Sequence, residues 1–164
     1  CEEVERRGGH VRSQILRHEL VPATAEVAAA LEIAPGDTVV ALERLRFIDD
    51  EPWSLTTTWM PEDIGAVTFD ADMADVSLYA VLADEGWHAV RGMRSAEATI
   101  ASPEQARLLG MSPGSALLLL RSTSYSESDR PMGHFVPYHR GDRSRFEFQL
   151  RATASTTELV HVPN

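Results

Sequence analysis

Two arginines, Arg44 and Arg46, stand two positions apart within residues 43–61, ERLRFIDDEPWSLTTTWMP. This stretch is typical of a β-hairpin, and side chains two apart on a strand point to the same face of a sheet. Guanidinium groups bind phosphate or carboxylate through paired charge-assisted hydrogen bonds, so the two arginines are a candidate anion site. The alternative is a solvated strand face with weak ion pairs, and the spacing alone favours that alternative.

The composition indicates one compact domain in a reducing compartment. The chain has 164 residues, 43% of them hydrophobic, which is enough for a core of its own. Its net charge of −10 argues against a surface that grips nucleic acid, because such a surface is basic. The single cysteine, Cys1, has no partner for an internal disulfide, and no apolar run approaches the roughly 20 residues of a membrane helix. A cytoplasmic protein is expected.

The start of the chain differs from the rest. No methionine opens it, and residues 1–10, CEEVERRGGH, are polar and charged. Such a segment is typical of a linker. We therefore expect residues 1–11 to be a linker from a missing N-terminal domain and residues 12–164 to form one folded domain.

Apolar periodicity and capping signals predict alternating strands and helices. Thr24 and Ser102 are expected as N-caps, and Ser102 is followed by Pro103 and Gln105, the pattern of a capping box. Residues 62–76 carry the weaker pattern of a loop or short helix. Strands are predicted over residues 12–20, 38–48, 53–60, 88–101, 115–128 and 131–140, helices over 24–33, 77–86 and 102–110, and a turn over 49–52, DDEP.

The order of elements repeats within the chain. Residues 24–42 align with residues 102–120, with Pro-Gly at the same place in both. Each half is a strand, a helix, a Pro-Gly turn and a hairpin, which predicts the α+β class: a mostly antiparallel sheet with flanking helices, built from two similar units. Ser122 and Ser124 stand where the first half has its two arginines. Because the second copy keeps the scaffold without the cations, a role outside folding is favoured for the pair.

A series of short motifs follows one another in a set order along the chain. It comprises L-x-I-x-P-G, L-x-R-L-R, D-D-E-P, W-M-P, S-L-Y-x-x-L, E-x-x-I-A, A-R-L-L-G and RGDRSRF. Over residues 12–146 this series resembles the UTRA domain, the effector-sensing half of HutC-type regulators in the GntR family. The resemblance implies a fold similar to chorismate lyase, a homodimer, and an N-terminal winged helix-turn-helix that binds operator DNA.

The resemblance also implies which residues hold the effector. In that family the R-x-R strand and the start of the S-x-Y helix converge on the acidic group of a small metabolite, which implicates Arg44, Arg46, Ser77 and Tyr79. A helix start also attracts anions through its free N–H groups. For Ser77 a plain helix cap is the alternative, and for Tyr79 the alternative is packing in the core.

Three positions depart from the family pattern. Sugar-phosphate sensors of this type often have glutamates at the positions of Thr56 and Gly133 and a tyrosine at that of His139. Carboxylates that would accept hydrogen bonds from sugar hydroxyls are missing here, which favours an anionic ligand with a less hydroxylated body. The predicted ligand pocket is completed by Thr56, Thr58, Phe135 and His139.

No catalytic or metal-binding motif accompanies the arginines. G-x-S-x-G, H-E-x-x-H and phosphate-binding glycine loops are absent from the sequence, and the six histidines lack metal-ligand spacing. We expect no catalytic residue, no cofactor and no metal.

The predicted function is that of an effector-binding, dimerising domain of a bacterial GntR/HutC-family transcriptional repressor. Its partners would be a small anionic effector, a second copy of the chain, and operator DNA through the missing winged helix-turn-helix. Effector binding would modulate DNA binding. The alternative is a chorismate lyase-like enzyme that acts on a small aromatic or cyclic acid, because a fold does not by itself determine a function.

Overall fold

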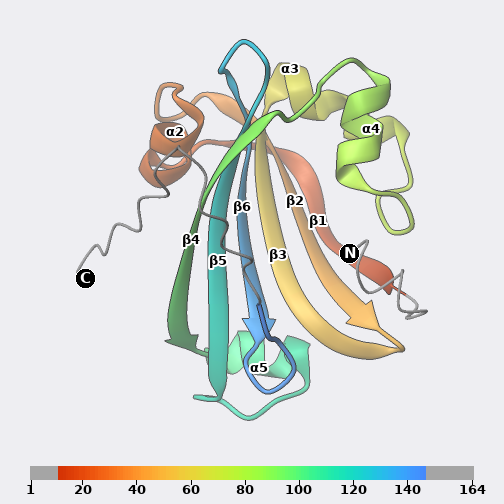
Figure 1. The fold of residues 1–164 in the computed structure, drawn as a ribbon, viewed down its shortest axis with the longest axis vertical. Helices are drawn as coiled ribbons and strands as arrows, with labels where there is room; N and C mark the ends of the chain where they lie inside the picture. The colour runs from red at the N-terminus through yellow and green to blue at the C-terminus, as the bar shows by residue number, and fades with distance from the viewer. Residues whose placement is uncertain (1–10, 147–164) are drawn as a thin grey trace, which may run out of the picture.

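A six-stranded sheet forms the centre of the molecule (Figure 1). The computed structural model describes residues 11–146, so most of the predicted linker and residues 147–164 of the predicted domain lie outside the described residues. Paired strands are all antiparallel, in the order β1-β2-β3-β6-β5-β4, which confirms the predicted α+β class. The strands are β1 (Val11–Pro22), β2 (Thr38–Ile48), β3 (Glu51–Pro61), β4 (Arg91–Ile100), β5 (Ala116–Tyr125) and β6 (Pro131–Arg140).

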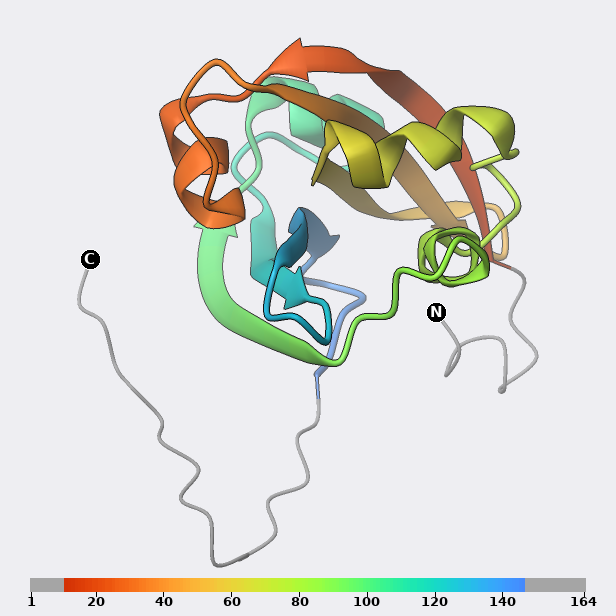
Figure 2. The same ribbon diagram turned by 90° about the horizontal axis from the view of Figure 1, so that it is seen from above.

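Short helices pack on both faces of this sheet (Figure 2). Helices α2 (Ala25–Leu31) and α5 (Pro103–Leu109) pack on one face, near opposite ends of the strands (Figure 1). Helices α3 (Glu62–Gly65) and α4 (Leu78–Asp84), with the 3-10 helix η1 (Ala66–Asp70) between them, pack on the other face, which we call the α4 face. Within residues 11–146, no helix has the length and apolar character needed to cross a membrane.

The two halves of the chain share their local structure, as the sequence repeat predicts. The side-chain oxygen of Thr24 caps α2, and that of Ser102 caps α5. Both helices end in the left-handed region, at Glu32 with φ 55° and at Gly110 with φ 63°. The hairpins of the two halves meet where β3 pairs with β6, so the repeated units form one continuous sheet.

The first hairpin turns more tightly than the sequence predicts. The predicted turn covers residues 49–52, but only Asp49 and Asp50 lie between the strands, and β3 begins at Glu51. Both aspartates have positive φ angles, 49° and 66°. A two-residue turn of this kind matches the right-handed twist of the strands, and aspartate tolerates the left-handed region. Pro52 therefore belongs to β3 rather than to the turn.

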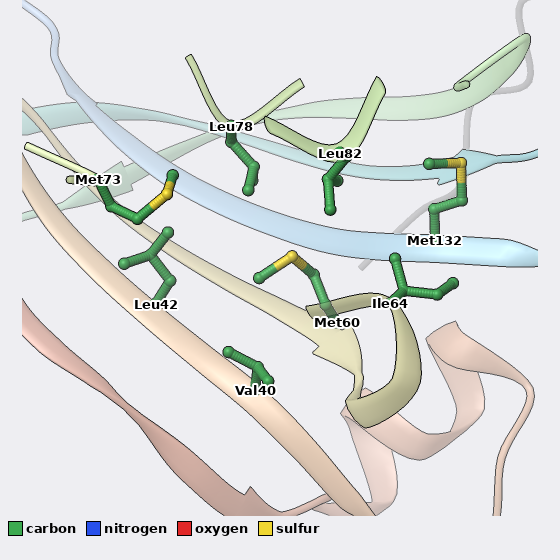
Figure 3. Close-up of a cluster of buried hydrophobic side chains, with 8 residues drawn as sticks. All are labelled: Val40, Leu42, Met60, Ile64, Met73, Leu78, Leu82 and Met132. Atoms are coloured by element: carbon green, nitrogen blue, oxygen red, sulfur yellow. The ribbon is translucent and has the colours of Figure 1, made fainter. Parts of the chain in front are cut away.

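A buried apolar cluster joins the α4 face to the helices above it. No member of the cluster is more than 4% exposed. Burial of each large apolar side chain contributes about 1.5–3 kcal/mol, so the cluster fixes residues 62–84 over the sheet. Figure 3 shows its members, which come from both sides of this contact: Val40, Leu42, Met60, Ile64, Met73, Leu78, Leu82 and Met132.

Gly65 lets α3 approach the sheet closely. A Cβ atom at this position would lie 2.7 Å from Cβ of Val40 and 3.0 Å from Cβ of Met60. We expect Gly65→Ala to lower the free energy of unfolding by roughly 1–3 kcal/mol, because overpacking displaces these buried side chains. Urea denaturation measures the change. Gly92→Ala is the control, since its nearest contact would be an ordinary 3.6 Å. An equal loss in both variants would contradict the packing argument.

Candidate functional site

The register of the sheet puts both arginines on the α4 face. Arg44 is opposite Thr56, and Arg46 is opposite Ser54, which in turn is opposite His139 on β6. Residues directly opposite each other in an antiparallel pair share a face. Two cations, two hydroxyls and an imidazole are therefore neighbours in two adjacent rows across the sheet.

Arg44 is a buried cation that makes no ion pair with the described residues. Only 5% of it is exposed. Its Nη1 donates to the backbone oxygen of Met73 at 3.5 Å, while its Nε–H has no acceptor within residues 11–146. Burial and, to a smaller extent, the charge of Arg46 lower the pKa of Arg44 to about 10. The guanidinium stays charged at neutral pH, and this shift corresponds to a cost of about 3 kcal/mol to the folded state.

Other polar groups of the α4 face are also buried without hydrogen bonds. Ser54 and Thr58 are 0% exposed, and neither hydroxyl has a partner in the described part of the chain. The same holds for Nδ1 of His139. Buried polar groups are nearly always paired, because an unpaired one costs about 1–3 kcal/mol. Several such groups beside a buried cation are suited to binding a polar, anionic molecule.

His139 is held in its neutral form. It is 6% exposed, and burial, with smaller contributions from the charges of Arg46 and Arg94, lowers its pKa to about 4. The rings of Trp53 and Phe146 lie 4.8 Å and 5.2 Å from the imidazole, centroid to centroid. At neutral pH the imidazole is therefore a hydrogen-bonding group within an aromatic environment.

Ser77 stands at the start of α4 but does not cap it. The residue is exposed, and its hydroxyl makes no capping hydrogen bond. Ser77 occupies the N-cap position, but the alternative of a plain side-chain cap does not hold. Its ψ angle is 126°, whereas the hydroxyl caps of α2 and α5 have ψ angles of 165° and 163°. The smaller angle accounts for the hydroxyl missing the N–H groups of the first turn.

Tyr79 lies over the sheet through a ring contact. Its ring stacks on that of Phe135, with centroids 5.6 Å apart, although 45% of the residue remains exposed. Burial raises the pKa of Tyr79, and the nearby Ser124 and Arg94 partly oppose that rise. The helix that begins at residue 78 thus extends one aromatic side chain toward the strands of the second half.

A hollow of about 410 Å³ lies beside Tyr79. Its charged residues are Arg91 and Arg94 alone, without any carboxylate. Its other lining residues are Ala89, Val90, Gly92, Met93, Ser122, Thr123 and Ser124.

Two larger hollows are less suited to an anion. One, of about 630 Å³, holds three acidic residues, and its single arginine, Arg130, already makes a two-pronged ion pair with Asp63 at 2.7 Å. The other, of about 560 Å³, lies against α5 and contains Glu43 and Glu104 but only Arg107 as a cation. Residues 11–146 contain no group of three His, Cys, Asp or Glu side chains placed to hold a metal ion.

Sequence reasoning missed Ser54 and Arg94 on this face. Arg94 is opposite Ser122 on β5, in the same row as Phe135. The internal repeat alone could not predict Arg94. The position of the first half that aligns with Arg94 lies on β1, where a bulge between Ile15 and Arg17 shifts the strand register. The period-two pattern of β3 did carry a signal for Ser54, since it lies two residues before the predicted Thr56.

The chain matches a known domain family over most of its length. The family model of the UTRA domain matches residues 6–145. The chain therefore belongs to the UTRA family and is a UTRA effector-binding domain of the GntR-type transcription regulators.

Its relatives are regulators of transcription. NagR, an HTH-type transcriptional repressor of Bacillus subtilis, is 24% identical over 88% of this chain and 60% of its own length. The ligand-binding domain of a protein described as a GntR-family transcriptional regulator from Bordetella bronchiseptica is 32% identical, covering 87% of this chain and 90% of that chain with a TM-score of 0.79. The effector domain of PhnF from Mycobacterium smegmatis is 24% identical, covering 92% and 93% with a TM-score of 0.86.

These comparisons confirm the predicted class of protein. The family and the curated relatives are transcriptional regulators rather than enzymes, as predicted, and the chorismate lyase-like enzyme finds no support. The predicted similarity of the fold to chorismate lyase stays a prediction. The chain spans between half and two thirds of the length of the curated relatives it matches.

Replacing the buried cation should stabilise the ligand-free domain. We expect Arg44→Met to raise the free energy of unfolding by roughly 1–3 kcal/mol, because an apolar side chain of similar length removes an unpaired buried charge. Urea denaturation measures this change. Arg107→Met, at an exposed arginine of α5, should change stability by less than about 0.5 kcal/mol. A loss of stability in Arg44→Met would mean that the arginine is a structural requirement.

His139 should make the domain sensitive to acid. Its pKa is lowered from 6.5 to about 4 in the folded state. The stability that it contributes is therefore complete above pH 6.5 and is lost as the pH falls to 4, since the unfolded chain takes up the proton first. Between neutral pH and about pH 4.5, the loss of unfolding free energy should be ~2 kcal/mol smaller in His139→Gln than in the parent protein. The same variant with the parent's acid response would contradict the assignment; His88→Gln, at an exposed histidine, is the control.

Proposed function

We propose that this domain senses a small metabolite with a phosphate or carboxylate group, and that the acidic group binds at Arg44 and Arg46. The observation that carries the proposal is the buried guanidinium of Arg44, which makes no ion pair with the described residues. Desolvation lowers its pKa, and an anion beside it would offset that cost. Charge-assisted hydrogen bonds to such an anion are the strong kind, because the donor is ionised and the surroundings exclude water.

The neighbouring residues support a ligand body with few hydroxyls. A side chain at position 133 would meet the ring of Phe135, whose nearest atom lies 3.1 Å from a Cβ built on Gly133. Tyr79 stacks on the same ring. An aromatic wall therefore stands where sugar-phosphate sensors often have a glutamate. Thr56, Thr58 and His139 would supply the remaining polar contacts, through hydroxyls and a neutral imidazole.

The ligand signal would pass through Met73. The backbone oxygen of Met73 accepts from Arg44, and its side chain belongs to the same buried apolar cluster as Leu78 and Leu82 of α4. The next residue, Ala74, accepts a hydrogen bond from the backbone N–H of Ser13 on β1 at 3.2 Å. An anion that draws Arg44 away from Met73 would therefore disturb both α4 and the first strand of the domain.

We propose that this disturbance reaches a DNA-binding half upstream of residue 12. In this proposal a winged helix-turn-helix precedes the linker at residues 1–11, the chain acts as a homodimer in the cytoplasm, and the effector releases the protein from its operator. NagR is named as a transcriptional repressor, which supports an effector that releases the protein from its operator. The effector can act only if it binds the released conformation more tightly, and a coupling of roughly 1–3 kcal/mol is typical.

Inorganic phosphate is the simplest probe of the proposed site. At constant ionic strength, saturating phosphate should raise the free energy of unfolding of the parent domain by roughly 1–3 kcal/mol, because it binds the folded state alone. Arg44→Ala and Arg46→Gln should lose this response, while Arg107→Gln should keep it. Calorimetric titration provides the dissociation constants. No response in the parent domain, or an equal response in Arg44→Ala, would sink the proposal.

A further inference from the structure

A third arginine faces the candidate site from the second half of the chain. Arg94 on β4 is opposite Ser122, the residue at the repeat position of Arg44. It is exposed and makes no ion pair or hydrogen bond with the described residues. Arg91, three residues earlier, is instead paired with Asp129 on the hairpin between β5 and β6. Arg94 is thus the cation of this strand that remains available to a ligand.

The hollow beside Arg94 is built for a polar group. Ser124, which lines it, is only 6% exposed, and its hydroxyl lies beside the phenol of Tyr79, where it partly opposes the rise in the pKa of Tyr79. Ser122 lines the same hollow. A hydroxyl has one donor and two acceptor sites, so Ser122 and Ser124 can still form hydrogen bonds with a group in the hollow. Ser124 and Arg94 together offer a hydroxyl and a guanidinium to one group.

The two cationic regions lie on either side of one imidazole. His139 on β6 is separated by one strand, β3, from Arg46 on β2, and by one strand, β5, from Arg94 on β4. Both arginines lower the pKa of His139, so both guanidiniums lie within electrostatic reach of its ring. The aromatic wall of Tyr79 and Phe135 is on this same face.

Within the described sheet, no carboxylate stands opposite Arg44 or Arg94. On the six strands, no acidic residue occupies the paired rows that contain Arg44 and Arg94. Two cations with no carboxylate opposite them in the sheet favour a ligand that brings a negative charge to each.

We infer that the effector carries two acidic groups, one bound by Arg44 and Arg46 and the other by Arg94 with Ser122 and Ser124. This inference rests on the proposed function and extends it, because it assigns a second anion subsite and a chemical class of ligand: a linear or flat molecule with an acid at each end. Its body crosses the sheet past Tyr79 and Phe135. Each half of the duplicated fold thereby holds one end of the ligand.

Calorimetric titration with chain-length pairs tests this inference. The probes are succinate, glutarate, adipate and pimelate, each compared with the monocarboxylate of the same length. The best diacid should bind the parent domain at least about tenfold more tightly than its matched monoacid, which corresponds to ~1.4 kcal/mol. In Arg94→Gln that advantage should vanish, and in Arg107→Gln, which removes an arginine from the far face, it should persist. Arg44→Ala should weaken both members of every pair.

The possible outcomes distinguish a failure of the second anion subsite from a failure of the proposed anion binding at Arg44 and Arg46. Diacids that bind no more tightly than monoacids, or a preference that survives Arg94→Gln, would overturn the second subsite. Phosphate binding that depends on Arg44 would in that case still stand, and Arg94 would be a solvated surface cation. If phosphate itself fails to bind, both the proposed function and the inference of a ligand with two acidic groups are contradicted.

Discussion

The buried charge of Arg44 is the constraint on which the rest of the structure depends. Its guanidinium is 5% exposed and has one long hydrogen bond, to the backbone oxygen of Met73, whose side chain belongs to the apolar cluster of the α4 face. The segment between η1 and α4 contacts the cation through Met73, and the neighbouring strand positions in its row supply no carboxylate. Keeping this positive charge out of water costs the folded state stability, which is consistent with the proposed binding of an anion.

The duplicated scaffold explains how the two halves of the α4 face can have the same backbone but different side chains. Both halves build the same hydroxyl-capped helix and the same left-handed helix end. The side chains that share the α4 face then differ: arginines at 44 and 46 in the first half correspond to serines at 122 and 124 in the second. Because the scaffold is common, these differences are not needed for folding, and a ligand bound across β3 and β6 as proposed would contact both halves.

Much of the fold follows from the sequence, because its signals are local. Hydroxyl caps, Pro-Gly turns and period-two strands predicted the repeat and the antiparallel sheet. The structure differs from the sequence-based expectation where backbone angles decide the local geometry. The turn at Asp49 and Asp50 is shorter than DDEP suggests. Ser77 has the right position for a cap, but its ψ angle differs from those of the hydroxyl caps. Non-local features were beyond reach. The sequence pairs Arg44 with Arg46 by spacing, but only the register of five strands brings Arg94 to the same face.

The central claim concerns one guanidinium, so side-chain NMR of arginine tests it most directly. Inorganic phosphate is titrated into the domain while the Nε–H resonances of its arginines are followed. The account predicts that the signals of Arg44 and Arg46 shift and saturate together, while that of Arg107 on the far face stays in place. An Arg44 signal that does not move at phosphate concentrations where the protein binds the ion would contradict the account.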